Sequence, residues 1–298
     1  MDVGISLNSS LGGEPVAAGR IMIERARLAN EVGLATLSVG DHHARPGNYF
    51  QNTPVLGRLL AEWDTRPAGC LFLLPLWNPV LVAEHIGTLA ALHDGPFIVQ
   101  TGVGAGADQF AAMGASLRTR GLATDEAIRV VKGLLAGETM SSGRFGTVDA
   151  AFGLRPAQPV EWWIGAGSAR GLDRAAREAD AWYAGPIVTP GSAVELLDRY
   201  RQSCADHERE PRALIRKDVL IRRDGAAAAA LAADLVAAGY RGMGRDALIV
   251  GTPEHAAEQV AAYADLGFEQ VVARCMNVPQ PVALETIELL AEVAALVA

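Results

Sequence analysis

The sequence predicts a closed barrel of eight parallel strands, each followed by a helix. Short apolar runs alternate with amphipathic stretches from end to end, which is typical of successive βα units on a parallel sheet. Eight such units fit within 298 residues, half of them hydrophobic, and α/β barrels commonly take about 250 residues as one domain. No linker or shift in composition divides the chain, so residues 1–298 are expected to form a single (β/α)8 TIM-barrel domain with short insertions. An open doubly wound sheet gives the same alternation and is the architectural alternative.

The elements follow in order along the chain. Strands are expected over 2–7, 34–39, 68–74, 96–102, 161–165, 180–184, 214–221 and 269–274. Helices are expected over 15–31, 53–62, 79–93, 117–136, 169–179, 190–207, 252–266 and 282–297. Pro79 after Asn78 and Pro253 after Thr252 mark helix starts, and Gly267 follows a last helical turn. Residues 226–239 form an extra helix, and 138–160 form an irregular or hairpin insertion.

Composition excludes several classes of partner. The net charge of −8 repels phosphate backbones and anionic membrane surfaces, so neither nucleic acid nor a membrane is expected as a partner. Three widely spaced cysteines fit neither a disulfide framework nor a zinc site. The first residues lack the pattern of a signal peptide, and no apolar run is long enough for a membrane span. A soluble protein of the reducing cytoplasm is therefore expected.

The densest group of candidate site residues is Asp41-His42-His43, directly after the second expected strand, with Asp41 and His42 as the catalytic candidates and His43 as a candidate for binding the substrate. The active site of a barrel is built at the carboxyl ends of its strands, which is where this segment falls. An imidazole there can move a proton near neutral pH, and a carboxylate can fix its tautomer. The alternatives are a loop capped by Asp41 with exposed histidines, or a metal-dependent hydrolase using Asp41 and His42, for which no further ligands are evident.

Two segments that contain glycine follow the fourth and fifth strands. Thr101-Gly102-Val103-Gly104-Ala105-Gly106 allows the backbone to approach a ligand closely, or simply to turn. Gly165-Ala166-Gly167-Ser168 leads into a helix whose first amides can bind a phosphate, although Ser168 also suits an ordinary N-cap. Trp77 after the third strand and Arg274 after the eighth are candidates for stacking on, or pairing with, a substrate.

Taken together, these residues resemble the bacterial luciferase-like superfamily of flavin- and deazaflavin-dependent oxidoreductases. The resemblance extends over nearly the whole chain and rests on five blocks in family order: 33–42, 74–80, 101–106, 163–168 with 179–182, and 250–254. It implies a barrel that binds the isoalloxazine ring across the strand ends, with the phosphate near the helix after the fifth strand. His42 matches the family's functional histidine. Asp41 matches the acid of the deazaflavin branch, whereas luciferases proper have a glutamate before two histidines, so Asp41-His42-His43 lies between the two patterns.

The resemblance also implies a strained, often cis, non-proline peptide near Leu71-Phe72 that supports the ring from behind. Two departures bear on cofactor and substrate. Ala107 stands where deazaflavin-dependent glucose 6-phosphate dehydrogenases have a glutamate, so their sugar substrate is not supported. Ala105 stands where luciferase has an arginine near the flavin phosphate. Coenzyme F-420 is therefore favoured slightly over FMN as the cofactor.

The function implied is an oxidoreductase that transfers a hydride or, with FMN, activates oxygen as a monooxygenase. The substrate is not identified. Trp77, Tyr49, Phe50 and Arg274 hint at an apolar or aromatic pocket with one anion partner, and the alternative is that these side chains serve only packing. The resemblance further implies a homodimer and, in the FMN case, a flavin reductase as partner. A metal-dependent barrel hydrolase and a non-catalytic flavin-binding relative are the alternatives.

Overall fold

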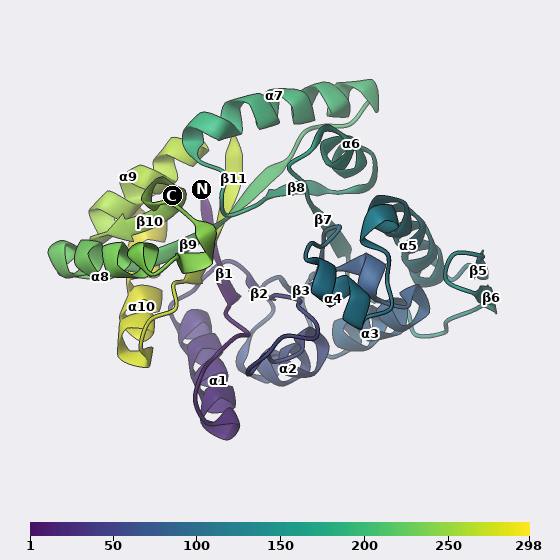
Figure 1. Ribbon diagram of the computed structural model, residues 1–298, viewed down its shortest axis with the longest axis horizontal. Coiled ribbons are helices and arrows are strands. Elements are labelled where there is room, and N and C mark those ends of the chain that lie inside the picture. The colour runs from purple at the N-terminus through teal and green to yellow at the C-terminus, as the bar shows by residue number, and fades with distance from the viewer.

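The chain folds into a closed barrel of parallel strands surrounded by helices (Figure 1). The computed structural model describes residues 1–298. The barrel strands, in the order in which they pair, are β1 (Asp2–Leu7), β2 (Leu37–Val39), β3 (Ala68–Phe72), β4 (Phe97–Thr101), β7 (Val160–Gly165), β8 (Ala181–Ala184), β9 (Ala213–Ile221) and β11 (Phe268–Cys275). Parallel pairing of β8 with β9 and of β11 with β1 closes the ring, which excludes the open sheet.

Eight helices connect these strands and cover the outside of the barrel. They are α1 (Pro15–Glu31), α2 (Asn52–Leu59), α3 (Pro79–Ala91), α5 (Arg120–Ala136), α6 (Ala169–Glu178), α7 (Pro190–Asp206), α9 (Pro253–Ala264) and α10 (Gln280–Leu296). Asn78 and Thr252 cap α3 and α9 as expected, because each side chain accepts a hydrogen bond from a first-turn amide. None of the helices has the combination of length and hydropathy that crossing a membrane requires.

The expected insertions are present, and two further elements join them. The segment 138–160 contains the hairpin of β5 (Met140–Ser142) and β6 (Thr147–Ala150), which projects at one side of the barrel in Figure 1. The extra helix is α8 (Gly225–Ala237). The unexpected elements are α4 (Ala107–Ala112) and β10 (Leu248–Gly251). The ends of the chain meet, because the Met1 ammonium group donates to the carbonyl of Val297 at 2.7 Å.

The interior of the barrel changes from apolar to polar along its axis. Successive residues of a strand point to opposite faces, so every second residue faces the interior. The lower interior is filled by Ile98, Trp163, Ala181, Tyr183, Leu214 and Val272. Two residues further along β4, β9 and β11, the inward positions hold Gln100, Arg216 and Arg274, and Asp218 follows on β9. The polar interior therefore lies at the carboxyl ends of the strands.

Strands β8 and β9 pair only over their lower halves and then separate. Residues Ala213–Ile215 of β9 pair with β8, whereas Asp218–Ile221 pair with β10. The upper half of β9 therefore leaves β8, and the loop after β8 borders a wider opening at this end of the barrel. This opening sets where a ligand can enter.

Candidate active site

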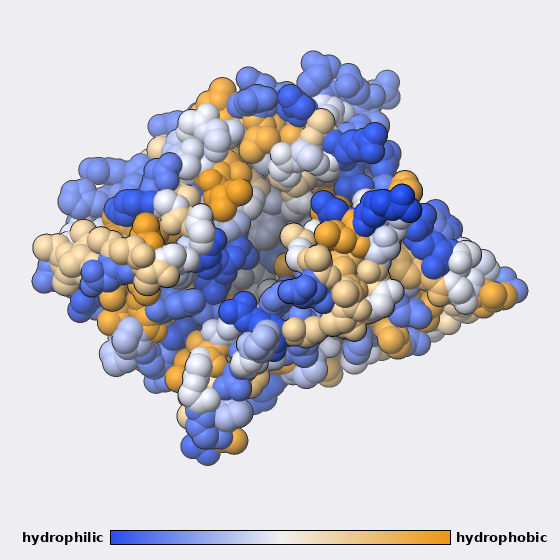
Figure 2. Space-filling model, in the orientation of Figure 1, coloured by the Kyte–Doolittle hydropathy of each residue, from blue (hydrophilic) through white to orange (hydrophobic).

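Two cavities meet at the carboxyl ends of the strands, and His42 lines both of them. The first, of about 900 Å³, we call the glycine-loop cavity because its walls include Gly102–Ala105 after β4, Gly165–Ser168 after β7 and Gly185–Val188 after β8. The second, of about 370 Å³, we call the arginine pocket because Arg216, Arg241 and Arg274 line it. Figure 2 shows a hollow at the centre of this face, with hydrophobic surface over α4 on one side.

The glycine-loop cavity has bare main chain on its walls. A Cβ added at Gly102 would meet only the Gly165 carbonyl oxygen, at 3.9 Å, and one added at Gly167 or Gly185 would meet nothing within 4 Å. The buried hydroxyl group of Tyr183, which also lines this cavity, has no hydrogen-bond partner. A flat, polar-edged ring can therefore lie close to the backbone here and find a donor in Tyr183.

Gln109 fixes the tautomer of His42. The Oε1 atom of Gln109 accepts from the His43 backbone N–H at 2.8 Å, and its Nε2 donates to the Ala105 carbonyl at 3.0 Å, so the orientation of the amide is set. The same Oε1 contacts Nδ1 of His42, which must therefore carry the proton. The Nε2 atom of His42 makes no hydrogen bond within the protein, so the neutral ring offers a free lone pair to the cavities.

We expect neutral His42 to be the Nδ1–H tautomer, and Gln109→Leu to shift it toward the Nε2–H form. The physical reason is that Gln109 Oε1 accepts only when Nδ1 is protonated. Long-range ¹⁵N–¹H correlation spectra of histidine-labelled protein at mildly alkaline pH measure this directly. Gln51→Leu is the matched control, because Gln51 bonds only to the His42 carbonyl, at 3.2 Å. An Nε2–H ring in the unsubstituted protein would contradict the assignment.

Asp41 is held through its carboxylate by neighbouring barrel residues, at the edge of the arginine pocket. Its fully buried carboxylate accepts from the Leu73 backbone N–H and from Trp77 Nε1, both at 2.8 Å, through Oδ2. Its Oδ1 lies 3.1 Å from Nε2 of His43. These contacts tie the loop after β2 to the end of β3, so the geometry makes Asp41 a positioning residue for His42.

His43 and Trp77 line neither cavity, although both were expected against a substrate. Their rings pack edge to face at 5.2 Å, behind the site, and both are held by Asp41. His43 points away because adjacent residues of an extended segment project in opposite directions. Phe50 packs toward Gly19 of α1, whereas Tyr49 and Arg274 line the arginine pocket, so the structure brings only these two of the four hinted side chains together at a cavity.

Three residues expected at the cofactor lie outside the cavities: Phe72, Thr101 and Gly106. Phe72 is buried on the outer side of β3, where its ring meets Trp77 at 5.5 Å. Thr101 is also buried, and its hydroxyl donates to the Phe72 carbonyl at 2.8 Å. Leu71, one residue before Phe72, does line the arginine pocket, as strand alternation requires.

The cis peptide expected near Leu71-Phe72 is wrong, because no peptide bond in the structure is cis. Residues Ala68–Phe72 form a regular parallel ladder with Phe97–Thr101, which keeps this stretch extended. The chain turns only afterwards, at Leu73, where Asp41 accepts the backbone N–H.

The start of α6 faces the glycine-loop cavity and offers an anion site. Ser168 caps the helix by accepting from the Gly171 amide at 3.3 Å, which leaves the earlier first-turn amides without a helical partner. Ser192, in the first turn of α7, lines the same cavity. Ser168 can therefore cap α6 and also belong to a phosphate site, because the cap holds the first turn of α6, whose free amides border the cavity.

Lys217 anchors the loop after β8, which forms one wall of the glycine-loop cavity. Its buried ammonium donates to the carbonyls of Pro186 at 2.9 Å and Val188 at 2.8 Å. Tyr263 of α9 donates to the same Val188 carbonyl at 3.0 Å. Burial lowers the pKa of Lys217 to about 8, although the nearby carboxylate of Asp218 opposes the shift.

We expect unsubstituted protein to gain stability relative to Lys217→Met as pH rises. The folded pKa of about 8 lies below the unfolded value of 10.5, so between these values the unfolded chain binds more protons. The contribution is therefore smallest below about pH 8 and largest above about pH 10.5. Between about pH 7 and about pH 9.5 the difference in unfolding free energy should increase by about 2 kcal/mol. Urea titrations of both proteins measure it, and a pH-independent difference would contradict the assignment.

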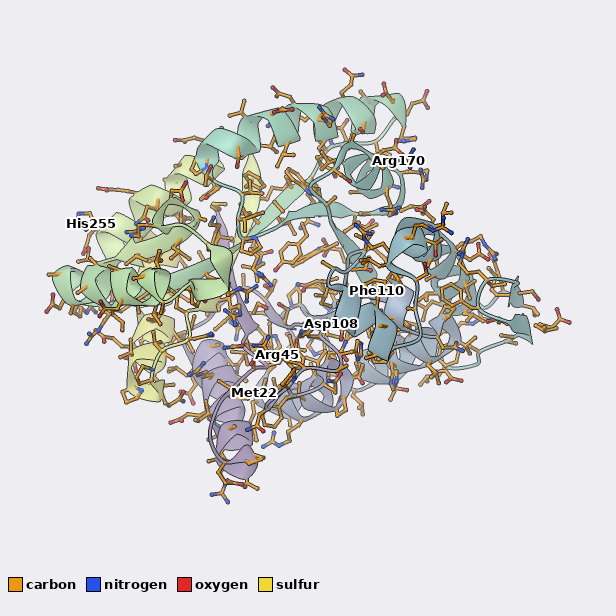
Figure 3. All side chains as sticks on the ribbon, in the orientation of Figure 1. Met22, Arg45, Asp108, Phe110, Arg170 and His255 are labelled. Carbon is orange, nitrogen blue, oxygen red and sulfur yellow. The ribbon has the colours of Figure 1, made fainter.

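The arginine pocket is polar on all sides, and most of its residues are absent from the sequence-based candidates. Arg274 was expected and is present, but it is joined by Arg216 and Arg241. The remaining lining is Ser6, Leu7, Asn8, Ser9, Ser10, Gly40, Asp41, His42, Arg45, Tyr49, Leu71 and Asn277. Figure 3 shows Arg45 near the centre of this face, whereas His255 lies at the periphery on α9. Burial, with a smaller contribution from Asp41, raises the pKa of Tyr49 to about 12.

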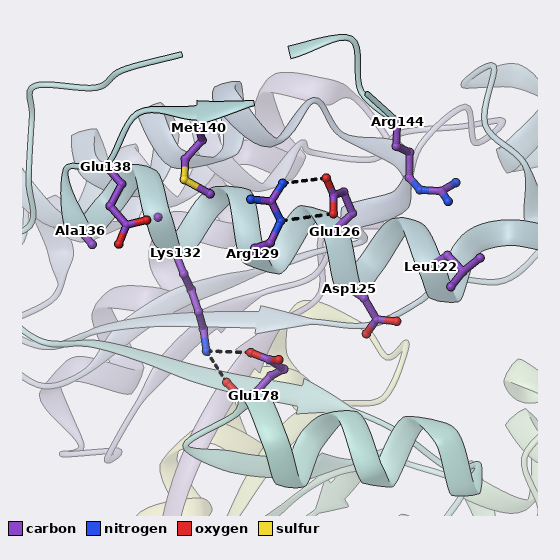
Figure 4. A pocket seen from close by; sticks show the side chains of 11 residues that line it. Leu122, Asp125, Glu126, Arg129, Lys132, Ala136, Glu138, Met140, Arg144 and Glu178 are labelled. Carbon is purple, nitrogen blue, oxygen red and sulfur yellow. Dashed lines mark hydrogen bonds and ion pairs between the residues drawn. The ribbon is translucent and has the colours of Figure 1, made fainter. Parts of the chain in front are cut away.

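A third hollow, between α5 and the β5–β6 hairpin, carries matched charges (Figure 4). Arg129 pairs with Glu126 at 2.8 Å, and Lys132 lies 3.6 Å from the carboxylate of Glu178. Because these cations already have partners, the hollow is a salt-bridged surface groove. No group of three or more His, Cys, Asp or Glu side chains in the structure is placed to hold a metal ion, so the hydrolase alternative gains no donor set.

Comparison with known proteins identifies similar chains. The family model described as luciferase-like monooxygenase matches residues 1–244. An F-420-dependent glucose-6-phosphate dehydrogenase of Kribbella flavida is 27% identical over 188 residues, which cover 59% of this chain and 55% of that protein. An uncharacterized protein of Mycobacterium tuberculosis is 32% identical over 164 residues, covering 54% and 55%. The matched region thus spans about half the length of these curated relatives.

Solved structures share the whole fold at low sequence identity. An F-420-dependent secondary alcohol dehydrogenase, in complex with an F-420–acetone adduct, superposes with a TM-score of 0.81 at 16% identity, covering all of both chains. The oxygenating constituent of a Pseudomonas putida 3,6-diketocamphane monooxygenase, in complex with FMN, gives 0.81 at 14% identity, covering 99% of this chain and 98% of that one. These likenesses confirm the barrel architecture.

Proposed function

Because the chain belongs to the luciferase-like monooxygenase family, we propose that it is an oxidoreductase that binds coenzyme F-420 or FMN in the glycine-loop cavity and a small substrate in the arginine pocket. The observation that carries the proposal is the position of His42. Its ring lies where the two cavities meet, with its tautomer set by Gln109 and its Nε2 free. A group in that position can exchange a proton with a substrate beside a bound ring.

The residues of the glycine-loop cavity fit a ring with a phosphate-bearing tail. The bare backbone at Gly102 and Gly167 leaves room for the ring, and the Tyr183 hydroxyl is free to bond to its polar edge. The first-turn amides of α6 suit the phosphate. The bound cofactor supplies hydride transfer or, in the case of FMN, oxygen activation.

The protein contributes orientation and proton handling. Neutral His42 can accept at Nε2 the hydroxyl proton of a substrate that is being oxidised, and in the reverse direction the imidazolium returns this proton to the oxygen of the substrate that is being reduced. Asp41 acts indirectly, because its carboxylate holds Leu73, Trp77 and His43 in place. Arg274 binds the substrate from the opposite wall of the arginine pocket.

The choice of cofactor rests on Ala105, Asp41 and the relatives. The curated dehydrogenases that resemble the chain are described as F-420-dependent, which agrees with the Asp41-His42 pair. Their glucose 6-phosphate substrate is not carried over, because Ala107 stands where those dehydrogenases have a glutamate. Hydride transfer with coenzyme F-420 is the favoured chemistry, and FMN-dependent oxygenation is the alternative.

Reoxidation of the bound reduced cofactor tests the proposal. Protein loaded with reduced coenzyme F-420 should stay reduced in air and be oxidised only when an organic acceptor is added. Protein loaded with reduced FMN should instead consume oxygen and oxygenate a substrate. Cofactor that binds but accepts and delivers electrons no faster than the free compound would identify a non-catalytic flavin-binding relative and overturn the proposal.

Three further expectations stay predictions. The family resemblance implies a homodimer and, in the FMN case, a flavin reductase as partner. Composition implies a cytoplasmic location. The assignment of residues 1–298 to one domain likewise stays a prediction. The exposed apolar side chains Leu81 on α3 and Leu122 on α5 lie on the outer helical layer, where a dimer contact would form.

A further inference from the structure

The arginine pocket holds more positive charge than its own residues neutralise. Asp218 is fully buried, and its Oδ2 accepts from Arg274 Nη1 at 3.0 Å and lies 3.5 Å from Arg241 Nε. The Tyr240 hydroxyl donates to the same oxygen at 2.7 Å. One carboxylate therefore serves two guanidinium groups.

Arg216 is the third cation, and no side chain compensates it. It faces the pocket from β9, two residues before Asp218, and no hydrogen bond or ion pair involves it. Its Nε atom is buried without a partner. Four guanidinium groups, of Arg216, Arg241, Arg274 and Arg45 at the rim, face two carboxylates, of Asp218 and Asp41, which leaves an excess of two positive charges.

Asp41 supplies one of the two negative charges in this count but pairs with none of the arginines. Its carboxylate accepts from the neutral Leu73 N–H and Trp77 Nε1 and lies beside His43. Burial and the neighbouring Arg274 lower the pKa of Arg241, while Asp218 raises it. Arg274 is buried, Arg216 is half-buried and the side chain of Arg241 is 35% exposed, so the three cations face one another at the pocket. Cations crowded at a partly buried site without enough acids are costly for a folded protein, so such a cluster is expected where a ligand brings the missing negative charge.

Guanidinium groups recognise oxyanions through paired N–H donors, and they suit phosphate and carboxylate groups best. The rest of the polar lining presents hydroxyl and amide groups, from Ser6, Asn8, Ser9, Tyr49 and Asn277. The Ser9 hydroxyl is buried without a partner, so it too can bond to a ligand. The lining therefore fits a small hydrophilic molecule with a doubly charged end.

We propose that the arginine pocket binds a doubly charged oxyanionic group of the substrate, a phosphate monoester or a dicarboxylate, through Arg216, Arg241 and Arg274. This inference rests on the proposed function, since it names the substrate class of that site. An anionic end held by these arginines leaves the rest of the substrate extending toward His42, which lines the same pocket.

Calorimetric titration of the full chain without cofactor tests the proposal. Inorganic phosphate and malonate are the probes, with ionic strength held constant by sodium chloride. We expect one-to-one binding of at least one probe, and preference for phosphate or malonate distinguishes the two substrate types. Arg216→Gln should weaken that binding about tenfold or more, because the paired, charge-assisted hydrogen bonds from one guanidinium group to the anion are lost. Arg216→Lys should recover part of the loss.

Arg216 is the most suitable arginine to replace, because it pairs with no acid, whereas replacing Arg241 or Arg274 would remove a partner of Asp218. The unfolding midpoint of Arg216→Gln without anion should equal or exceed that of the unsubstituted protein. The matched control is Arg223→Gln, an exposed arginine paired with Glu292, which should bind the probe unchanged. Failure of both probes to bind, or equal binding by Arg216→Gln, would overturn the proposal.

The titration is independent of the proposed redox function. Cofactor binding in the other cavity is measured separately, so loss of anion binding with intact cofactor binding would refute only the substrate class. Anion binding without binding of either cofactor would refute the redox function.

Discussion

Replacing Gly102 by phenylalanine should weaken cofactor binding by about 100-fold or more, or about 2.7 kcal/mol. Gly102 lines the glycine-loop cavity, and a Cβ built there meets only the Gly165 carbonyl oxygen, at 3.9 Å. A benzyl group therefore extends into the space assigned to the ring and not into the barrel wall. The φ angle of Gly102 lies outside the left-handed region, so a residue with a side chain adds no backbone strain there.

Fluorescence titration of Gly102→Phe with the cofactor that binds unsubstituted protein measures this effect. Gly143→Phe is the matched control, because a Cβ at Gly143 meets nothing within 4 Å and this residue lies in the turn of the β5–β6 hairpin, at the side of the barrel (Figure 1). The control should bind cofactor normally, and urea denaturation should show little change for either variant. Normal binding by Gly102→Phe would place the cofactor elsewhere.

Replacing His42 by alanine should lower the rate of substrate-dependent cofactor oxidation by about 10²- to 10⁴-fold, which is the usual contribution of a positioned acid or base. The reason is that His42 lines both cavities and that its Nε2 atom, unlike Nδ1, makes no hydrogen bond within the protein. Because the ring is only half-buried and packs at the edge of Tyr49, its loss leaves no core cavity, and the fold should persist.

Single-turnover stopped-flow measurements separate this chemical step from cofactor binding. The dissociation constant of the cofactor should change by no more than about threefold, since the walls formed by Gly102 and Gly165 stay in place. His255→Ala, an exposed histidine at the start of α9, is the control and should behave like unsubstituted protein. A rate for His42→Ala equal to that of the control would remove His42 from the mechanism.

The barrel strands could be predicted from the sequence because each is a buried apolar run with turn signals on both sides. The eight expected strands correspond to the eight of the barrel, with boundaries that differ by at most a few residues. The two missed elements lack such signals. Helix α4 has only six residues and begins after Gly106, which supplies no side-chain cap. Strand β10 has four residues and lies on the outer half of β9, outside the ring.

The site was predictable where function follows from position at a strand end, as at His42 and the glycine segments. The site was not predictable where the direction of a side chain decides whether it reaches a cavity. His43 and Trp77 adjoin His42 and β3 in sequence, yet both turn into the packing behind the site. Gln109 acts from the unpredicted helix α4.

The arginine pocket was missed because its members come from separate elements. One signal was present: Arg216 and Asp218 are two apart within the expected strand 214–221, and strand alternation places both on one face. Two charged residues on the inner face of a barrel strand indicate a polar interior. Arg241 lies beyond the α8 insertion, so only the folded chain shows that it shares Asp218 with Arg274.

The central claim is that the glycine-loop cavity binds a flavin-type ring, and paired titrations of the purified full-length chain with coenzyme F-420 and with FMN test it most directly. Binding followed by cofactor fluorescence should be micromolar or tighter for one of the two, with coenzyme F-420 favoured, and it should be lost in Gly102→Phe but kept in Gly143→Phe. If neither cofactor binds, or if Gly102→Phe binds as tightly as the unsubstituted protein, the account of this site is wrong.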